Sequence, residues 1–149
     1  MAHGTHNALD DPRNEDVLVY INGELLHRND AKISVFDSGY LVGDGVWEGL
    51  RLHKGELVFL KDHLDRLFQG AKAIGMDLKM SREEITEKIH KTLKANDMTD
   101  GVHVRVMFTR GIKKTPSQDP RLTVSGPNLV IIAEYKKADP ESRNRGIKL

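Results

Sequence analysis

The order of hydrophobic and polar positions along the chain changes twice, from alternation to a helical period and back to alternation. Alternating positions predict strands, and the dipeptides Asn22-Gly23 and Lys54-Gly55 between them predict tight turns. In the first part of the chain, the predicted extended segments cover residues 17–23, 24–28, 31–37, 47–53 and 56–60. Two further strands are predicted later in the chain, at residues 102–111 and 128–135.

The 3.6-residue period lies between these two groups of strands, where it predicts two helices. Residues 62–75 carry an apolar stripe, with Asp62 placed to cap the first turn and Gly75 placed to end the last. Residues 82–95 carry a second stripe, which opens with a Ser-x-x-Glu capping box. Because the helices are grouped, the sequence predicts an α+β domain: a small domain with a mostly antiparallel sheet and two adjacent helices.

The two ends of the chain are polar and stand apart from this pattern. Residues 1–15 are interpreted as a mobile N-terminal arm, and residues 137–149 as an exposed connection whose last residues begin another strand. His3 and His6 lie in the arm without a third ligand at a fixed spacing. No metal site is therefore expected.

Composition excludes several classes of protein. The 149 residues are 38% hydrophobic and 30% charged, which argues against a disordered chain and against a membrane protein. The N-terminal residues lack the apolar core of a secretory signal, and the absence of cysteine excludes disulfides and thiolate chemistry. A net charge of +1 and 5% aromatic residues give no reason to expect a nucleic-acid or membrane partner. These features fit a cytoplasmic protein.

A glycine-rich stretch over residues 38–53 is the first candidate for chemistry. Gly43, Gly45 and Gly49 do not follow the G-x-G-x-x-G spacing, and no helical pattern comes directly after them, so a dinucleotide site is not predicted. Two interpretations remain. The glycines either permit a kinked start of a strand, or they let bare backbone line a ligand cleft with Trp47 as its wall.

Two arginines and one histidine are the other candidates. Arg66 is predicted near the start of the first helix, where its guanidinium would join free backbone N–H groups in an anion site; the alternative is a surface arginine. Arg105 lies on the polar face of a strand, so its side chain reaches either solvent on an open sheet face or a carboxylate ligand. His63 is interpreted as a packing or helix-end residue, because no Ser-His-Asp or His-Glu-x-x-His pattern accompanies it.

Four stretches taken together resemble the class IV aminotransferases, a family that includes branched-chain aminotransferases, D-amino acid aminotransferases and aminodeoxychorismate lyases. The combination of a Gly-Asp-Gly-Val-aromatic-Glu-Gly string and a later His-apolar-Asp-Arg-Leu string is specific, whereas either piece alone is weak. The four stretches are VYINGELL at 19–26, YLVGDGVWEGLR at 40–51, HLDRL at 63–67 and VRVMFTRG at 104–111.

The resemblance implies roles for four residues. Arg66 matches the family arginine that grips the phosphate of the cofactor, pyridoxal 5'-phosphate. Trp47 matches an aromatic residue that borders the substrate pocket, and Arg105 matches an arginine of the branched-chain group that is directed at a substrate carboxylate. Tyr40 lies on the segment that approaches the pocket.

The resemblance also implies a second domain, which carries the lysine that forms a Schiff base with the cofactor. No lysine of this chain, Lys148 included, occupies the matching motif. We therefore expect residues 16–136 to be the N-terminal domain of a class IV aminotransferase and residues 137–149 to lead toward a C-terminal cofactor domain. No catalytic residue is expected in this chain, and the 149 residues alone are expected to be inactive.

The parent enzyme is expected to transfer an amino group between an amino acid of branched-chain type and a 2-oxo acid, with pyridoxal 5'-phosphate supplying the electron sink. The resemblance also implies a homodimer. An enzyme of the aminodeoxychorismate lyase type, which uses the same scaffold and cofactor, is the alternative. A non-catalytic interaction fragment is the alternative from a different class.

Overall fold

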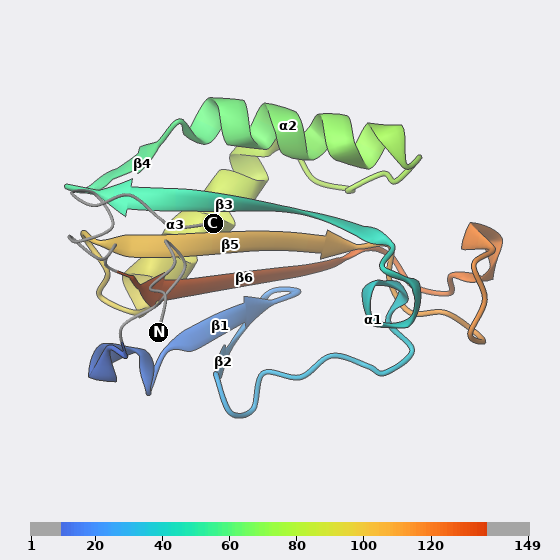
Figure 1. Ribbon diagram of the computed structural model, residues 1–149, viewed down its shortest axis with the longest axis horizontal. Helices are drawn as coiled ribbons and strands as arrows, with labels where there is room; N and C mark the ends of the chain where they lie inside the picture. The colour runs from blue at the N-terminus through green and yellow to red at the C-terminus, as the bar shows by residue number, and fades with distance from the viewer. Residues whose placement is uncertain (1–9, 137–149) are drawn as a thin grey trace, which may run out of the picture.

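A computed structural model describes residues 10–136, which form one antiparallel sheet with two long helices packed on it (Figure 1). The six strands follow the order β2-β1-β6-β5-β3-β4, and every neighbouring pair is antiparallel. The predicted α+β class is therefore confirmed. The strands are β1 (Leu18–Ile21), β2 (Glu24–His27), β3 (Gly45–His53), β4 (Glu56–Val58), β5 (Val102–Thr109) and β6 (Asn128–Tyr135), and the helices are α1 (Ser38–Val42), α2 (Leu60–Ala73) and α3 (Arg82–Ala95), with short 3-10 turns η1 (Pro12–Asn14) and η2 (Pro120–Leu122).

Strict alternation in the central strands gives the sheet one apolar face. In β5, Val104, Val106 and Phe108 are buried, while the residues between them are less covered. This face packs against the helices, because an apolar sheet face must be removed from water. The core shared by sheet and helices includes Leu50, Leu64, Leu67, Ile85, Ile89, Leu93, Leu129 and Ile131.

The two long helices pack beside different strands. Helix α2 runs along β3, and α3 packs against β6 and β1, behind the sheet in the view of Figure 1. Among residues 10–136, no helix is both long and apolar enough to cross a bilayer. The opposite sheet face carries no long helix in the described part of the chain and presents odd-numbered residues of β3 and β5.

Helix α2 begins earlier than the sequence predicts. Asp62 does not cap it; the helix starts at Leu60, and Asp62 lies within the first turn. The N-cap position belongs to Phe59, whose left-handed backbone (φ 53°) turns the chain from β4 directly into the helix without a side-chain cap. The predicted strand over 56–60 is shortened to β4 for the same reason. By contrast, the Ser81–Glu84 capping box of α3 is confirmed.

The predicted third extended segment, residues 31–37, is wrong as a strand. It forms no ladder with another strand, and only Asp37 makes an isolated bridge, to Ile112. Instead, the Asp37 carboxylate accepts a hydrogen bond from the Gly39 N–H and caps α1, a helix that the sequence did not predict. Gly43 ends this helix in the left-handed conformation, at φ 70°.

The ends of the chain lie partly outside the described residues, which exclude 1–9 and 137–149. Residues 10–15 are the described part of the expected N-terminal arm. They contain η1 and are hydrogen-bonded to the end of β6. The Asn14 side-chain amide donates to the Tyr135 carbonyl at 2.9 Å, and the Tyr135 N–H donates to Asn14 Oδ1 at 2.8 Å. The predicted connection and its final strand fall outside these residues.

Substitution of Gly111 tests how closely the chain after β5 packs. The Gly111 carbonyl accepts a hydrogen bond from the Ser38 N–H at the start of α1. Its φ of 117° disfavours any side chain, and an added Cβ would overlap the Gly126 carbonyl oxygen. We expect Gly111→Ala to lower the free energy of unfolding by about 1–3 kcal/mol from backbone strain, with a further loss from the clash. Urea denaturation of the variant and of wild type measures the total loss.

Gly23→Ala is the matched control, because Gly23 has a similar φ of 110° and no atom within 4 Å of the added Cβ. It is expected to show the strain without the clash and therefore the smaller loss. Equal losses in the two variants would contradict the close approach of Gly111 to Gly126.

Candidate active site

A buried carboxylate on β3 is bound by two side chains of α2. Glu48 is only 4% exposed. Its Oε1 accepts a hydrogen bond from Arg66 Nε at 2.5 Å, and its Oε2 accepts one from Arg66 Nη2 at 2.7 Å. The ring of His63 approaches the same Oε2, with Nδ1 at 2.8 Å. Both carboxylate oxygens are therefore paired, as a charge removed from water requires.

The local sequence explains why these three side chains meet. Alternation in β3 turns Glu48 toward the helical face, on the same side as Leu50. On α2, His63 and Arg66 are three residues apart, so they lie on one face of the helix, one turn from each other. Because α2 runs along β3, that face meets Glu48.

The electrostatics of the cluster keep Glu48 ionised at neutral pH. The hydrogen bond from Arg66 lowers the pKa of Glu48; burial opposes this shift, and the hydrogen bond with His63 adds to it. The same contact with Glu48 raises the pKa of Arg66. Since an ionised carboxylate only accepts hydrogen bonds, we assign the proton on His63 to Nδ1.

Part of the Arg66 guanidinium faces solvent. Its side chain is 70% exposed, although Nε and Nη2 are bound to Glu48. Nη1 makes no hydrogen bond or ion pair within residues 10–136. The edge formed by Nη1 and the second hydrogen of Nη2 is thus available to an anion. A planar edge with two donors matches two oxygens of a phosphate group.

The sequence predicted that Arg66 would share an anion site with free backbone N–H groups at the start of the helix, and this part of the prediction was wrong. Because α2 begins at Leu60, Arg66 lies in its second turn, beyond the free N–H groups of the first. The guanidinium is oriented by Glu48, not by the end of the helix.

Trp47 and Arg105 lie together on the opposite face of the sheet. They come from neighbouring strands: Trp47 stands opposite Met107, and Gly49 stands opposite Arg105, so Trp47 and Arg105 form a diagonal pair. The guanidinium carbon of Arg105 lies 4.5 Å from the centre of the Trp47 ring, a cation–π contact. Trp47 is 58% exposed, and Arg105 points away from the core.

The same face carries further positive charge around His103. Arg51 is paired with His103 across the two strands, and Arg105 lies two residues along β5. Burial is the largest cause that lowers the pKa of His103, and the positive charges of Lys136, Arg105 and Arg51 lower it further. This part of the open face therefore attracts anions.

The glycines of β3 have reasons within the chain itself. An added Cβ on Gly45 would lie 2.6 Å from the Phe108 carbonyl oxygen, and one on Gly49 would lie 2.9 Å from His103 Nε2. With Gly43 ending α1, these contacts support the interpretation of a kinked start of a strand.

Tyr40 is not joined to the other predicted residues. It lies on α1 and is 73% exposed. Within the described residues it shares no hydrogen bond, ion pair or ring contact with Trp47, Arg66 or Arg105.

A second ion pair fixes the far end of α2. Asp44 accepts hydrogen bonds from Arg110 Nε at 2.6 Å and from Arg110 Nη2 at 3.0 Å. The same guanidinium donates to the carbonyls of Ile74 and Gly75, just past the last turn of α2. Arg110 thus connects the start of β3 and the end of β5 to the C-terminus of the helix.

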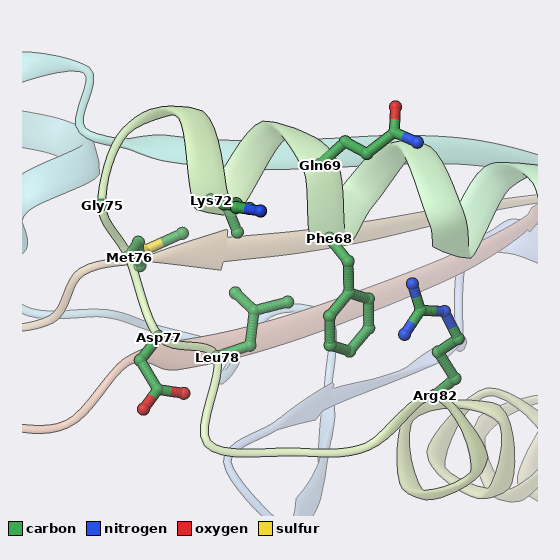
Figure 2. Close-up of a pocket in the computed structure, with 9 residues that line it drawn as sticks. Phe68, Gln69, Lys72, Gly75, Met76, Asp77, Leu78 and Arg82 are labelled. Atoms are coloured by element: carbon green, nitrogen blue, oxygen red, sulfur yellow. The ribbon is translucent and has the colours of Figure 1, made fainter.

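Near that end of α2 lies a cavity of about 500 Å³, shown in Figure 2. The Phe68 ring and the Arg82 side chain point toward each other there, and the guanidinium carbon lies 4.2 Å from the ring centre. The cavity contains none of the predicted site residues. Its lining is Phe68, Gln69, Ala71, Lys72, Gly75, Met76, Asp77, Leu78 and Arg82. No group of three or more potential metal ligands occurs in the described part of the chain.

Sequence reasoning missed Glu48 and the contact that His63 makes with it. A signal for Glu48 was present, because it occupies an inward position of β3 among Val46, Leu50 and Leu52. A charged residue in such a position must have partners. For His63, the signal was its spacing of one turn from Arg66.

Comparisons with known proteins show which family this chain is similar to. A family model described as amino-transferase class IV matches residues 45–149. Branched-chain-amino-acid aminotransferase-like protein 1 of Arabidopsis thaliana is 46% identical over 125 residues, which are 84% of this chain and 22% of that protein. D-alanine aminotransferase of Staphylococcus epidermidis is 40% identical over 93 residues, 62% of this chain and 33% of the relative.

The fold has solved counterparts as well. The branched-chain aminotransferase of the archaeon Thermoproteus uzoniensis, solved with norvaline, superposes with a TM-score of 0.67 at 27% identity, covering 80% of this chain and 40% of that one. A second branched-chain amino acid aminotransferase, solved with pyridoxamine 5'-phosphate, superposes with a TM-score of 0.70 at 25% identity, covering 79% of this chain and 40% of that one. The chain therefore belongs to the class IV aminotransferase family. It spans about a fifth to a third of the length of the Arabidopsis and Staphylococcus relatives.

The lowered pKa of Glu48 predicts a pH-dependent contribution to stability. Such a group stabilises the fold fully above its unfolded pKa, near the ordinary value of 4.5, and the contribution is lost as the pH falls through the folded value. We expect Glu48→Gln to lower the free energy of unfolding by about 1–3 kcal/mol near neutral pH. The difference from wild type should close as the pH falls below 4.5, as measured by urea denaturation across the acid range.

Glu87→Gln removes an equal charge from an exposed site on α3 that forms no hydrogen bond or ion pair in the described residues. This control should stay close to wild type throughout. A Glu48→Gln difference that persists unchanged into acid would show that its cause is not the ionised carboxylate.

Proposed function

We propose that this chain is the small domain of a pyridoxal-phosphate-dependent aminotransferase and contributes its phosphate-binding arginine and one side of its substrate pocket. The observation that carries the proposal is the Arg66 guanidinium, held by Glu48 on one edge and open on the other. The family match and the similar enzyme solved with pyridoxamine 5'-phosphate support this cofactor.

The donors of this chain fit the phosphate end of the cofactor. An exposed, oriented guanidinium suits a phosphate, which carries several oxygen acceptors and a negative charge. When bound, pyridoxal phosphate supplies the electron sink for amino transfer. In this proposal, Arg66 anchors the phosphate, and the lysine that bonds the cofactor comes from outside residues 10–136.

The open face of the sheet is proposed to border the substrate. Trp47 and Met107 offer apolar surface, which suits the side chain of a branched-chain amino acid or its 2-oxo acid. Arg105 would bind the second carboxylate of a dicarboxylic partner. Tyr40 is proposed to approach the same pocket from α1. The Arabidopsis relative, named as branched-chain-amino-acid aminotransferase-like, supports this substrate class.

The complete enzyme is proposed to be a homodimer. The exposure of Tyr40 and of the apolar residues near it, Phe36 and Val42, leaves surface for such an assembly.

The role of Arg66 can be tested by cofactor retention in the complete enzyme. Arg66→Ala removes the two-donor edge, so the affinity for pyridoxal phosphate should fall about tenfold or more. Arg66→Lys keeps the charge but loses the planar edge, and it should lie between the alanine variant and wild type. The rate at which each variant loses cofactor during dialysis, monitored by visible absorbance, measures these differences. If Arg66→Ala keeps its cofactor as well as wild type, Arg66 is only a surface residue.

The role of Arg105 can be tested by substrate discrimination. Only a dicarboxylic substrate offers Arg105 a second carboxylate, so Arg105→Ala should raise KM for such a substrate by about tenfold or more and change KM for an aliphatic one little. Steady-state kinetics with one substrate of each class measure the ratio. Arg51→Ala is the control for a general loss of positive charge on this face. Equal effects of Arg105→Ala on both substrates would favour a structural role.

A further inference from the structure

We propose that Glu48 is a positioning residue: it fixes the Arg66 guanidinium so that its free edge is presented to an anion, and His63 fixes Glu48 in turn. This inference rests on the proposed phosphate binding by Arg66. It gives a function to two residues that neither touch the phosphate nor face the open side of the sheet.

The geometry of the guanidinium carries the first step. Its five N–H groups lie in one plane, and two of them, on Nε and Nη2, form one edge of that plane. This edge is the one bound to Glu48. The neighbouring edge, formed by Nη1 and the other hydrogen of Nη2, is then directed away from Glu48 by the rigid shape of the group. Two contacts to one carboxylate fix the plane as well as the position.

The position of Glu48 carries the second step. The carboxylate is 4% exposed, whereas the Arg66 side chain is 70% exposed. An arginine on a helix surface would otherwise sample many rotamers and lose that freedom when a ligand binds. A buried partner that holds it beforehand lowers this cost, which is the general benefit of preorganisation.

His63 supports the carboxylate in the third step. Its Nδ1 lies 2.8 Å from Oε2, the same oxygen that accepts from Arg66 Nη2. Since His63 lies one turn before Arg66 on α2, two side chains of the same helix contact the Glu48 carboxylate. The carboxylate therefore cannot rotate without losing its contacts with both His63 and Arg66.

A simpler role for Glu48 makes the opposite prediction. If the carboxylate only neutralises Arg66, removing its charge should strengthen the binding of any anion at the free edge. If it positions Arg66, removing it should weaken that binding, even though the site becomes more positive. The sign of the change thus separates the two roles.

The test uses the 149-residue chain and nuclear magnetic resonance of the Arg66 Nε–H group. In the wild-type chain this resonance should report a rigid side chain, and titration with inorganic phosphate or pyridoxal 5'-phosphate should shift it. In Glu48→Gln the side chain should become mobile, and the affinity for both probes should fall about threefold to tenfold. Pyridoxal without phosphate should give no shift in either chain.

Three further variants make the result specific. Glu48→Asp keeps the charge on a shorter side chain and should lie between wild type and Glu48→Gln; it also serves if the glutamine variant does not fold. Glu87→Gln removes an equal charge from the exposed face of α3 and should leave phosphate binding unchanged. His63→Ala should loosen Arg66 less than Glu48→Gln does, because it leaves both Arg66–Glu48 contacts in place.

The outcomes distinguish this inference from the proposed function. Equal or tighter phosphate binding in Glu48→Gln, or an Arg66 side chain as rigid in that variant as in wild type, would overturn the positioning role. Phosphate shifts that persist undiminished in Arg66→Ala, or their absence from the wild-type chain, would overturn the phosphate site instead. In that second case the mobility of Arg66 still decides whether Glu48 positions it.

Discussion

The buried charge of Glu48 is the constraint on which the placement of α2 depends. A carboxylate that is 4% exposed must be paired, and the side chains that pair it, Arg66 and His63, both belong to this helix. The helix can therefore neither slide nor rotate on β3 without exposing an unpaired charge to an apolar surface. Apolar packing alone would tolerate such movement more readily, since it is not directional.

Strand β3 connects the two halves of the proposed site. Because successive side chains of a strand point to opposite faces, Glu48 meets the helix while Trp47 meets the open face. Strand β4 pairs only with Arg51–His53, so within the described residues the earlier part of β3 has one edge without a strand partner. The proposed phosphate anchor and substrate face thus lie on either side of an edge without a strand partner, and in the proposed function a second domain brings the cofactor to both.

Local signals explain what the sequence could predict. Alternation and turn dipeptides predicted the hairpins and the central strands, and the Ser81–Glu84 capping box predicted the start of α3. The errors arose where tertiary contacts override such signals. Phe59 starts α2 from a left-handed conformation without any capping side chain, and Asp37 caps an unpredicted helix while it accepts hydrogen bonds from the Thr109 hydroxyl and the Asn128 amide. Pairing across many residues, such as Glu48 with Arg66, leaves only the inward-facing charge as a clue in the sequence.

The stretches that carry the family resemblance prove to be partners in space. Asp44 of the Gly-Asp-Gly string binds Arg110 of the Thr-Arg-Gly string, and Arg110 also holds the end of α2. Glu48 of the first string binds Arg66 of the His-Leu-Asp-Arg string. Loss of Arg66 would leave the buried Glu48 carboxylate without its two-point partner. Loss of Asp44 or of Arg110 would leave the other charge unpaired and little exposed to water, at a cost that exceeds the loss of a surface contact. The specificity of the combined motif thus has a physical origin, because its pieces hold one another in the arrangement that leaves the outer edge of Arg66 free.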